Sequence, residues 1–242
     1  MRVAVQRRFI DQFPHWWLFS LSFSAWAALA VGWLATTGSI DVTTLGAICG
    51  RSARNADVLS VWLASIPMMF AMVLPLTIGG ARRVAERSLW GRRQRGIAVY
   101  VASYVATWAV VAFFAIALST SVVSELGAVE TSTLCGVLFL AAAAFRSHSL
   151  HRTARATCHD VQPLAPMGWT ADLSCLRYGV HHGKACVISC GLSTAAAYLS
   201  RYPMAYMVIA STVSYAERYR LRADSRLPSA LLLVAAAGSL VI

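Results

Sequence analysis

Charged residues are scarce in this sequence, and acidic residues are the scarcest of them. Only 13% of the 242 residues are charged, and 10 acidic residues face 21 Lys and Arg, whereas 58% of the chain is hydrophobic. A soluble domain of this length has too little interior to bury so many apolar side chains. The composition therefore predicts that a lipid bilayer is the main solvent of the chain.

The sequence signatures of several enzyme classes are also missing. There is no glycine-rich phosphate loop of the Walker or dinucleotide type, no G-x-S-x-G turn and no H-E-x-x-H helix. These absences argue against a nucleotide-driven pump and against a hydrolase. No basic segment carries the interleaved aromatic residues that recognise bases, so we expect no nucleic-acid partner. The sequence favours a protein without catalytic activity of its own.

Long apolar runs recur along the chain. A spanning helix needs roughly 20 mostly apolar residues; four runs meet that requirement, and three more are shorter or begin polar. The runs are Trp16 to Thr36, Val58 to Gly79, Ile97 to Ser119, Leu126 to Phe145, Ala185 to Leu199, Pro203 to Ala216 and Leu227 to Ile242. They predict an all-α, polytopic transmembrane helix bundle of about seven helices, with six as the alternative. Residues 1–242 would form a single transmembrane domain.

The positions of Lys and Arg test this topology, because hydropathy makes no use of them. With the N-terminus in the cytoplasm, every Lys and Arg except Arg51, Arg54 and Arg201 falls in a cytoplasmic segment. This distribution follows the positive-inside rule, and such a surface also attracts anionic lipid headgroups. We therefore expect a multi-pass protein of the inner (plasma) membrane, with the lipid bilayer as its partner.

The connection over residues 146–184 concentrates His and Cys. It holds His148, His151, His159, His181 and His182, together with Cys158 and Cys175. Pro163, Pro166 and Gly168 interrupt helix formation within it. We expect this segment to be cytoplasmic or to fold back as a re-entrant segment, which is allowed only where protein or water covers the backbone.

One helical face after this connection carries possible metal ligands. His182, Cys186 and Cys190 follow one another at a spacing of four residues, which places an imidazole and two sulfurs on the same side of a helix. Thiolate and imidazole ligands suit Cu(I) first and Zn(II) second. The alternative interpretation is that these small Cys side chains only pack against neighbouring helices.

Methionines form a second set of soft ligands. Met68 and Met72 lie four residues apart in the second run, between Pro67 and Pro75. Met204 and Met207 repeat the pattern in the sixth run. Thioethers bind Cu(I), but a stripe of Met is also a common form of adaptable core packing. Both interpretations remain open.

Glu217 is the main acidic residue expected near membrane depth. It lies at the cytoplasmic end of the sixth run and is followed directly by Arg218. Intramembrane proton or ion relays usually require buried carboxylates. With so few acids available, we expect Glu217 and Arg218 to form an interfacial ion pair instead.

The chain resembles a family of bacterial integral membrane proteins that are described as metal-binding and whose function is unknown. The resemblance is carried by Trp62, Met68, Met69, Ala71, Met72 and Pro75, by Tyr100, Tyr104 and Trp108, and by Cys158, Gly179, His182, Gly183, Cys186, Cys190, Met204, Met207, Glu217 and Arg218. Ile188, Ser189 and Gly191 stand where the family has Gly, Cys and Trp, so one thiol is missing and the chain looks like a degenerate member. The resemblance implies a metal-linked role, with copper as the cargo, and adds Cys158 to the candidate ligands.

These observations support one leading hypothesis and two alternatives. The leading hypothesis is a membrane protein that holds or delivers Cu(I) through His182, Cys186, Cys190, Met68, Met72, Cys158, Met204 and Met207. The first alternative is an accessory subunit of a larger membrane complex, such as a copper-dependent oxidase or monooxygenase, without a metal site of its own. The second is an enzyme with an intramembrane metal centre, which needs an open coordination position.

Overall fold

The computed structural model describes residues 14–37, 58–125, 128–160, 162–165, 167–200, 203–219 and 226–241, and the regular secondary structure of these residues is entirely helical. The helices are α2 (Trp16–Thr37), α4 (Val58–Arg87), the short 3-10 helix η1 (Trp90–Arg92), α5 (Arg93–Glu125), α6 (Ala128–Phe145), α7 (Ser149–Thr157), α8 (Gly168–Leu199), α9 (Pro203–Tyr219) and α10 (Arg226–Val241). The prediction of an all-α protein is confirmed.

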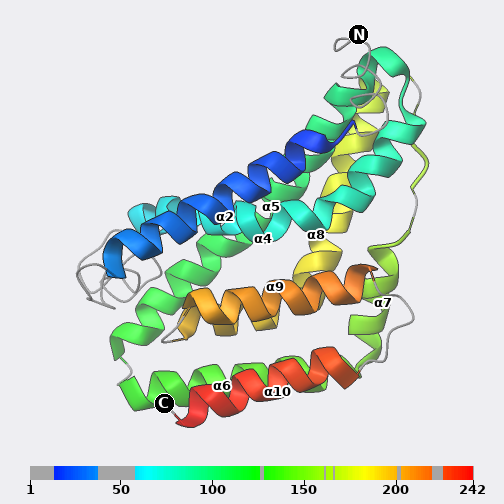
Figure 1. The fold of residues 1–242 in the computed structure, drawn as a ribbon. Helices are drawn as coiled ribbons and strands as arrows, with labels where there is room; N and C mark the ends of the chain where they lie inside the picture. The colour runs from blue at the N-terminus through cyan, green and yellow to red at the C-terminus, as the bar shows by residue number, and fades with distance from the viewer. Residues whose placement is uncertain are drawn as a thin grey trace.

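Helices α4, α5 and α8 form the centre of the bundle (Figure 1). α5 packs against both α4 and α8, and α2 covers α4. α6 and α10 pair with each other on the other side of the molecule, and α9 lies between the two groups in contact with α8, α10 and α4. This arrangement allows side chains from α4, α8 and α9 to meet.

Two glycines of α8 let this helix approach α5 closely. A Cβ atom on Gly179 would lie 1.9 Å from Ser103 Oγ and 2.4 Å from the backbone oxygen of Tyr100, and one on Gly183 would lie 2.9 Å from Thr107 Cβ. Small residues four apart are a common means of bringing helix backbones together in membrane proteins. The two glycines therefore fix the position of α8 against α5.

Helix α8 is longer than the apolar run that predicted it. The run begins at Ala185, whereas the helix begins at Gly168. Polar residues in the added turns have partners: Asp172 accepts a hydrogen bond from Arg92 at 2.6 Å and forms an ion pair with Arg95 at 2.7 Å. Because hydropathy does not register paired polar residues, it placed the start of the helix too late. Between α7 and α8, the described residues 158–160, 162–165 and 167 are not helical, which agrees with the predicted interruption.

Fewer helices meet the requirement for a membrane span than the sequence predicted. Within the described ranges, Val58–Arg87 and Trp90–Leu118 are long and apolar enough to cross a bilayer. A third span is formed if Glu130–Phe145 and Ser149–Thr157, which are bent by 75° relative to each other, are counted together. Trp16–Gly32 and Ser229–Ser239 are apolar but shorter. The structure therefore does not confirm seven spans.

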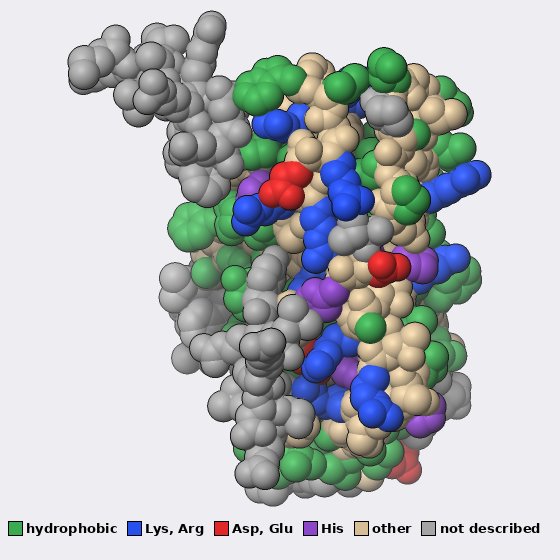
Figure 2. Space-filling model, turned by 90° about the vertical axis from the view of Figure 1, so that its right-hand side faces the viewer, with side chains coloured by type: hydrophobic (Ala, Val, Ile, Leu, Met, Phe, Trp, Pro, Cys, Tyr) green, Lys and Arg blue, Asp and Glu red, His purple; other side chains and the backbone are tan. Residues whose placement is uncertain are grey.

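Charged side chains gather on one face of the bundle. On the right-hand side of Figure 1, where α7 and the segment between α7 and α8 lie, Lys, Arg and His form a column down the surface (Figure 2). Arg152 of α7, and Arg177 and Lys184 of α8, are exposed. Hydrocarbon does not tolerate such a column. A membrane arrangement therefore requires this face to lie at or beyond the headgroups.

Candidate functional site

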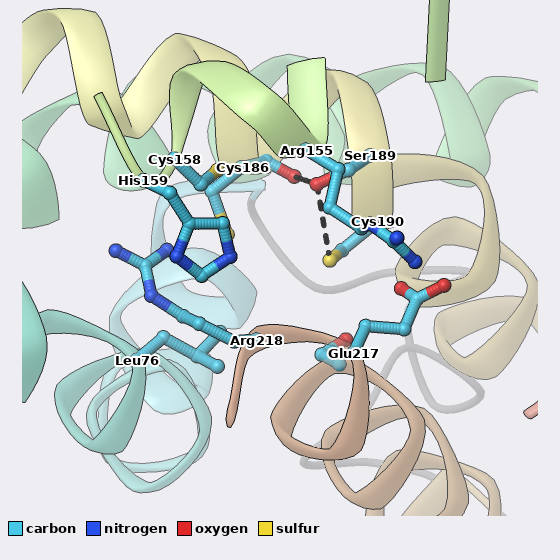
Figure 3. Close-up of a pocket in the computed structure, with 10 residues that line it drawn as sticks. Leu76, Arg155, Cys158, His159, Cys186, Ser189, Cys190, Glu217 and Arg218 are labelled. Atoms are coloured by element: carbon cyan, nitrogen blue, oxygen red, sulfur yellow. Dashed lines mark hydrogen bonds between the residues drawn. The ribbon is translucent and has the colours of Figure 1, made fainter. Parts of the chain in front are cut away.

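A small cavity of about 20 Å³ lies where α4, α7, α8 and α9 meet (Figure 3). We call it the thiol pocket, because three free cysteines contribute to its walls. It is lined by Leu76, Arg155, Cys158, His159, Cys186, Ser189, Cys190, Ser214, Glu217 and Arg218. A cavity of this volume holds about one water molecule, so the pocket has room for a single ion.

The three cysteines reach the thiol pocket from two elements. Cys186 and Cys190 lie one turn apart on α8, and both line the pocket. Cys158 is the C-cap residue of α7. All three are buried. Ser189, also on the wall, places its Oγ 3.4 Å from Cys190 Sγ. The structure thus brings together three of the predicted metal ligands, including Cys158, which only the resemblance had suggested.

The segment that follows Cys158 is held by donors from α4 and α8. Arg83 donates from Nη1 to the backbone oxygen of His159 at 3.1 Å, and Arg87 donates to that of Gln162 at 3.3 Å. The Tyr178 hydroxyl donates to the backbone oxygen of Asp160 at 3.4 Å. A non-helical segment needs such partners for its carbonyl groups. These bonds therefore position Cys158 and His159 against α8.

His182 belongs to this support and does not line the thiol pocket. Its Nε2 lies 3.3 Å from the backbone oxygen of Asp160, and its Nδ1 lies 3.1 Å from the Tyr100 hydroxyl. A carbonyl oxygen only accepts, so Nε2 carries the hydrogen and Nδ1 accepts from Tyr100. Both ring nitrogens are thus engaged with protein atoms. This side chain, predicted as a ligand from its spacing, instead connects α5 to the segment that carries Cys158.

Arg218 brings a buried positive charge into the thiol pocket. Its side chain is only 9% exposed, and no ion pair joins it to a carboxylate among the residues that the structure describes. It lines the pocket together with Cys158 and Cys186. A buried charge without a partner costs several kcal/mol. The position therefore favours a negative charge on the adjacent sulfur atoms.

Glu217 pairs with Arg146 and not with Arg218 as the sequence suggested. Glu217 and Arg146 form a buried ion pair at the edge of the thiol pocket, with side chains 7% and 9% exposed. His151 Nε2 lies 3.8 Å from the same carboxylate. Adjacent residues on a helix point in different directions, so Glu217 and Arg218 cannot face each other. The pair is buried and not interfacial. Arg218 is therefore not paired with Glu217, and it lies on the pocket wall with the cysteines (Figure 3).

His159 adds a nitrogen ligand that the sequence did not single out. Burial, with the positive charges of Arg218 and Arg83 as further causes, lowers the pKa of His159 below its usual value. The ring is therefore neutral near pH 7, which is the form that binds metals. Its Nε2 is buried and has no hydrogen-bond partner in the described part of the chain. The concentration of His residues over 146–184 pointed to this region, but the sequence spacing of His159 from the cysteines did not indicate that it lines the same pocket.

Met68, Met72 and Met207 do not line the thiol pocket. Met68, Met72 and Met207 are buried in the core, and Met72 lines a different cavity between α4, α5 and α8. Met204 belongs to α9, but its side chain lies outside the described residues. The soft ligands therefore fall into two separate groups, cysteines in one cavity and thioethers elsewhere.

The thiol pocket is not a fully assembled metal cage. Among the described residues, no three His, Cys, Asp or Glu side chains already stand at metal-binding distances from a common point. The donor set nevertheless suits a soft ion, because it offers three thiols, a neutral imidazole and a compensating guanidinium around space for one ion.

A helical protein with such a pocket has the donor chemistry of the soft-metal-binding class. The chain belongs to the PpoB2 copper chaperone family, whose family model matches residues 58–241. This range contains every residue of the thiol pocket. No curated protein and no solved structure matches the chain. Family membership confirms the copper-related part of the prediction.

Proposed function

We propose that this protein is a copper chaperone of the bacterial inner membrane that holds Cu(I) in the thiol pocket and delivers it to a copper-dependent protein. The observation that carries the proposal is the convergence of Cys158, Cys186 and Cys190 on one buried cavity beside Arg218. Copper is the cargo in this proposal and not a resident cofactor.

Charge balance supports Cu(I) as the ion. An ion of charge +1 held by two thiolates forms a unit of charge −1, which the buried guanidinium of Arg218 neutralises. Glu217 does not disturb this balance, because Arg146 already neutralises it. The second guanidinium on the wall, that of Arg155, is only partly buried, so solvent screens its charge. Thiolates also prefer soft ions. The pocket therefore suits a soft ion held by thiolates.

Zn(II) is the competitor that the test must include. Three thiols and one imidazole, as offered by the cysteines and His159, form a ligand set that Zn(II) also accepts. A zinc ion with three thiolates carries charge −1, which Arg218 would neutralise equally well. The family to which the chain belongs favours copper, and competition between the two ions decides the matter directly.

Membrane insertion is part of the proposal. Two helical stretches meet the length and apolarity of a span, and large apolar side chains such as Phe23, Phe114, Leu118 and Val234 are exposed on the bundle surface. Exposed apolar area of this kind is costly in water and favourable in lipid. A multi-pass bundle with the basic face toward the cytoplasm satisfies both observations.

The test is Cu(I) titration of the purified full-length protein under anaerobic, reducing conditions against a chromogenic Cu(I) chelator. We expect one tightly bound Cu(I) per chain, and an affinity at least about 100-fold lower for the double variant Cys186→Ser/Cys190→Ser, because it loses direct ligands rather than outer partners. Ser189→Cys should raise the affinity, since it adds a soft ligand on the pocket wall. Zn(II) in excess should not displace the bound Cu(I).

Cys175→Ser and Cys135→Ser are the matched controls. Both cysteines are free and buried but do not line the thiol pocket. If these variants weaken binding as much as the pocket variant does, the effect is on folding and the proposed site is wrong. A wild-type protein that takes up no Cu(I), or that prefers Zn(II), would also contradict the proposal.

The accessory-subunit hypothesis remains a prediction that the same material tests. The exposed apolar side chains that fit lipid would fit other membrane subunits as well. Purification from the native membrane in mild detergent should then retain a constant set of larger subunits even when Cys186 and Cys190 are replaced. A protein that purifies alone and carries Cu(I) contradicts it.

A further inference from the structure

A second, larger cavity lies between α4, α5 and α8. Its volume is about 250 Å³. Met69 and Met72 of α4, Trp108 of α5, and Thr194 and Tyr198 of α8 line it together with small apolar residues. We call it the thioether cavity. Its walls hold two thioether sulfur atoms and two aromatic rings but no Asp, Glu, His or Cys.

The thioether cavity and the thiol pocket follow each other along two helices. Met72 lines the first and Leu76, one turn further along α4, lines the second. On α8, Cys190 lines the thiol pocket and Thr194, one turn further, lines the thioether cavity. Thr194 Oγ1 donates to the backbone oxygen of Cys190 at 3.0 Å. One helical turn rises about 5.4 Å, so the two cavities are neighbours.

The sulfur atoms and the aromatic ring of Trp108 in the thioether cavity favour a soft cation of low charge. Met69 and Met72 lie three residues apart on α4, a spacing that puts side chains side by side on a helix. Thioether sulfur binds Cu(I) and carries no charge. The ring of Trp108 adds attraction between its face and a cation. Its side chain is buried, and its Nε1 has no hydrogen-bond partner among the described residues, so no such bond ties the ring to a neighbour.

We propose that Met69, Met72 and Trp108 form a second, weaker Cu(I) site through which the ion reaches the thiol pocket. This inference rests on the proposed function, because it concerns the same cargo. In the transfer, the bonds from Cu(I) to the thioether sulfurs break and bonds to cysteine sulfurs form. The protons displaced from the thiols pass to water, and copper stays in the +1 state throughout.

The order of the two sites follows from their charges. Neutral thioethers accept Cu(I) without releasing a proton, so Cu(I) binds there quickly. The affinity is low, because the sulfur atoms carry no charge. Cysteine sulfur binds Cu(I) as a thiolate, and Arg218 on the wall of the same pocket balances that negative charge, so Cu(I) is held more strongly there. Transfer from the thioether cavity to the thiol pocket therefore runs downhill.

The neighbouring Met68 provides a matched control. It is buried like Met69 and Met72 but does not line the thioether cavity. Met to Leu is a nearly volume-conserving change that cores tolerate well. The variants Met69→Leu/Met72→Leu and Met68→Leu therefore differ in the loss of cavity thioethers rather than in core volume.

The experiment uses full-length protein in lipid nanodiscs under anaerobic conditions, with Cu(I) supplied as its acetonitrile complex. Stopped-flow absorbance of the copper–thiolate band follows filling of the thiol pocket, and tryptophan fluorescence follows the thioether cavity. We expect Met69→Leu/Met72→Leu to retain the strong site, to lose the weaker one and to fill the strong site about tenfold more slowly, a barrier change of about 1.4 kcal/mol. Met68→Leu should behave like the wild type.

Two further variants separate this inference from the proposed function. Cys186→Ser/Cys190→Ser should lose the strong site but keep weak Cu(I) binding and its fluorescence change, and Trp108→Phe should remove that fluorescence change. If Met69→Leu/Met72→Leu fills the thiol pocket as fast as Met68→Leu does, the second site is wrong while the thiol pocket stands. If the wild type binds no Cu(I) at all, both proposals fail.

Discussion

Arg218 is the residue that separates the thiol pocket from an ordinary group of buried cysteines. Burial raises the pKa of the Cys158 thiol above its usual value, whereas the nearby positive charge of Arg218 lowers it. Free cysteines are often buried simply as small apolar side chains. A guanidinium beside them is costly unless it meets a negative charge, so its presence favours a pocket that holds thiolates.

Replacing Arg218 should weaken Cu(I) binding in a way that depends on pH. The variant Arg218→Met removes the charge and keeps an apolar side chain, and we expect an affinity about 10- to 100-fold lower near pH 7, the usual effect of losing an outer partner of a metal ligand. Without Arg218, the pKa of Cys158 rises further, so protons compete better with Cu(I). The loss should therefore shrink as the pH is raised toward 9, which chelator titrations at several pH values measure.

Arg218→Lys serves as the control for this prediction. Lysine keeps the charge but lacks the planar, multiple donors of arginine, so its affinity should lie between those of the wild type and Arg218→Met. A melting temperature measured in parallel shows whether the variants fold. An affinity loss of equal size in both variants at every pH would contradict the role of the charge.

Sequence reasoning identified part of this site and missed the rest for a physical reason. The spacing of Cys186 and Cys190 on one helix face is local, so the sequence alone predicted that the two thiols would share a site. Arg218 and His159 enter the pocket from α9 and from the segment after α7, and no local spacing reports such contacts. His182 has the spacing of a ligand, but its ring nitrogens bond to Tyr100 and Asp160.

At the scale of helices, the contact between α5 and α8 connects the fold to the site. Tyr100 and Ser103 of α5 face Gly179 of α8. One turn further, Gly183 faces Thr107, and Cys186 and Cys190 follow on the same helix. The Tyr100 hydroxyl also donates to His182, which holds the segment of Cys158. A change in this contact should therefore affect both stability and copper binding.

Gly179→Ala should destabilise the protein by about 1–3 kcal/mol, the typical cost of overpacking. The added Cβ would lie 2.4 Å from the backbone oxygen of Tyr100, and a backbone atom cannot move aside without shifting α5 against α8. The midpoint of unfolding in denaturant measures the change, and Cu(I) affinity should fall with it.

Gly79→Ala is the matched control in this case, because a Cβ at that position meets no atom within 4 Å. It should leave the midpoint unchanged or raise it, since alanine has the higher helix propensity. Equal effects of the two substitutions would show that α5 and α8 do not pack as described.

Apolar runs in the sequence located most of the helices but not their lengths. The run from Val58 to Gly79 lies within α4, and the run from Ile97 to Ser119 lies within α5. α4 continues through Pro67 and Pro75 as one helix. The polar start of α8 escaped prediction because its stability comes from partners on other helices, such as Arg92 and Arg95 around Asp172.

At the scale of the whole molecule, charge and apolar surface define two different environments. The basic face lies on the side of the bundle that carries α7 (Figures 1 and 2), and Arg155 of α7 also lines the thiol pocket. Large apolar side chains are exposed on other helices, including Phe19, Phe114 and Val234. If the basic face lies in the cytoplasm, Cys158 and His159 lie on the side of the membrane where thiols stay reduced.

Reporter fusions in the full chain test this orientation. The positive-inside rule predicts cytoplasmic locations for fusions after Leu89, between α4 and η1, and after Ser147, between α6 and α7. It predicts a periplasmic location for a fusion after Ser200, between α8 and α9. Green fluorescent protein, which folds poorly outside the cytoplasm after export in unfolded form, should fluoresce at the first two sites. Alkaline phosphatase, which needs disulfides, should be active only at the third.

The pattern of these fusions distinguishes the alternatives for the number of spans. Active phosphatase after Ser147 would place the thiol pocket on the oxidising side, where its three cysteines would require protection from disulfide formation. Fluorescence after Ser200 would mean that α8 does not cross the membrane, which agrees with its polar first half and reduces the number of spans. Phosphatase activity after Ser200 together with fluorescence after Ser147 requires α8 to span, because α7 and α8 begin on the cytoplasmic side. That outcome would support a bundle of more than the two or three spans that length and apolarity alone identify.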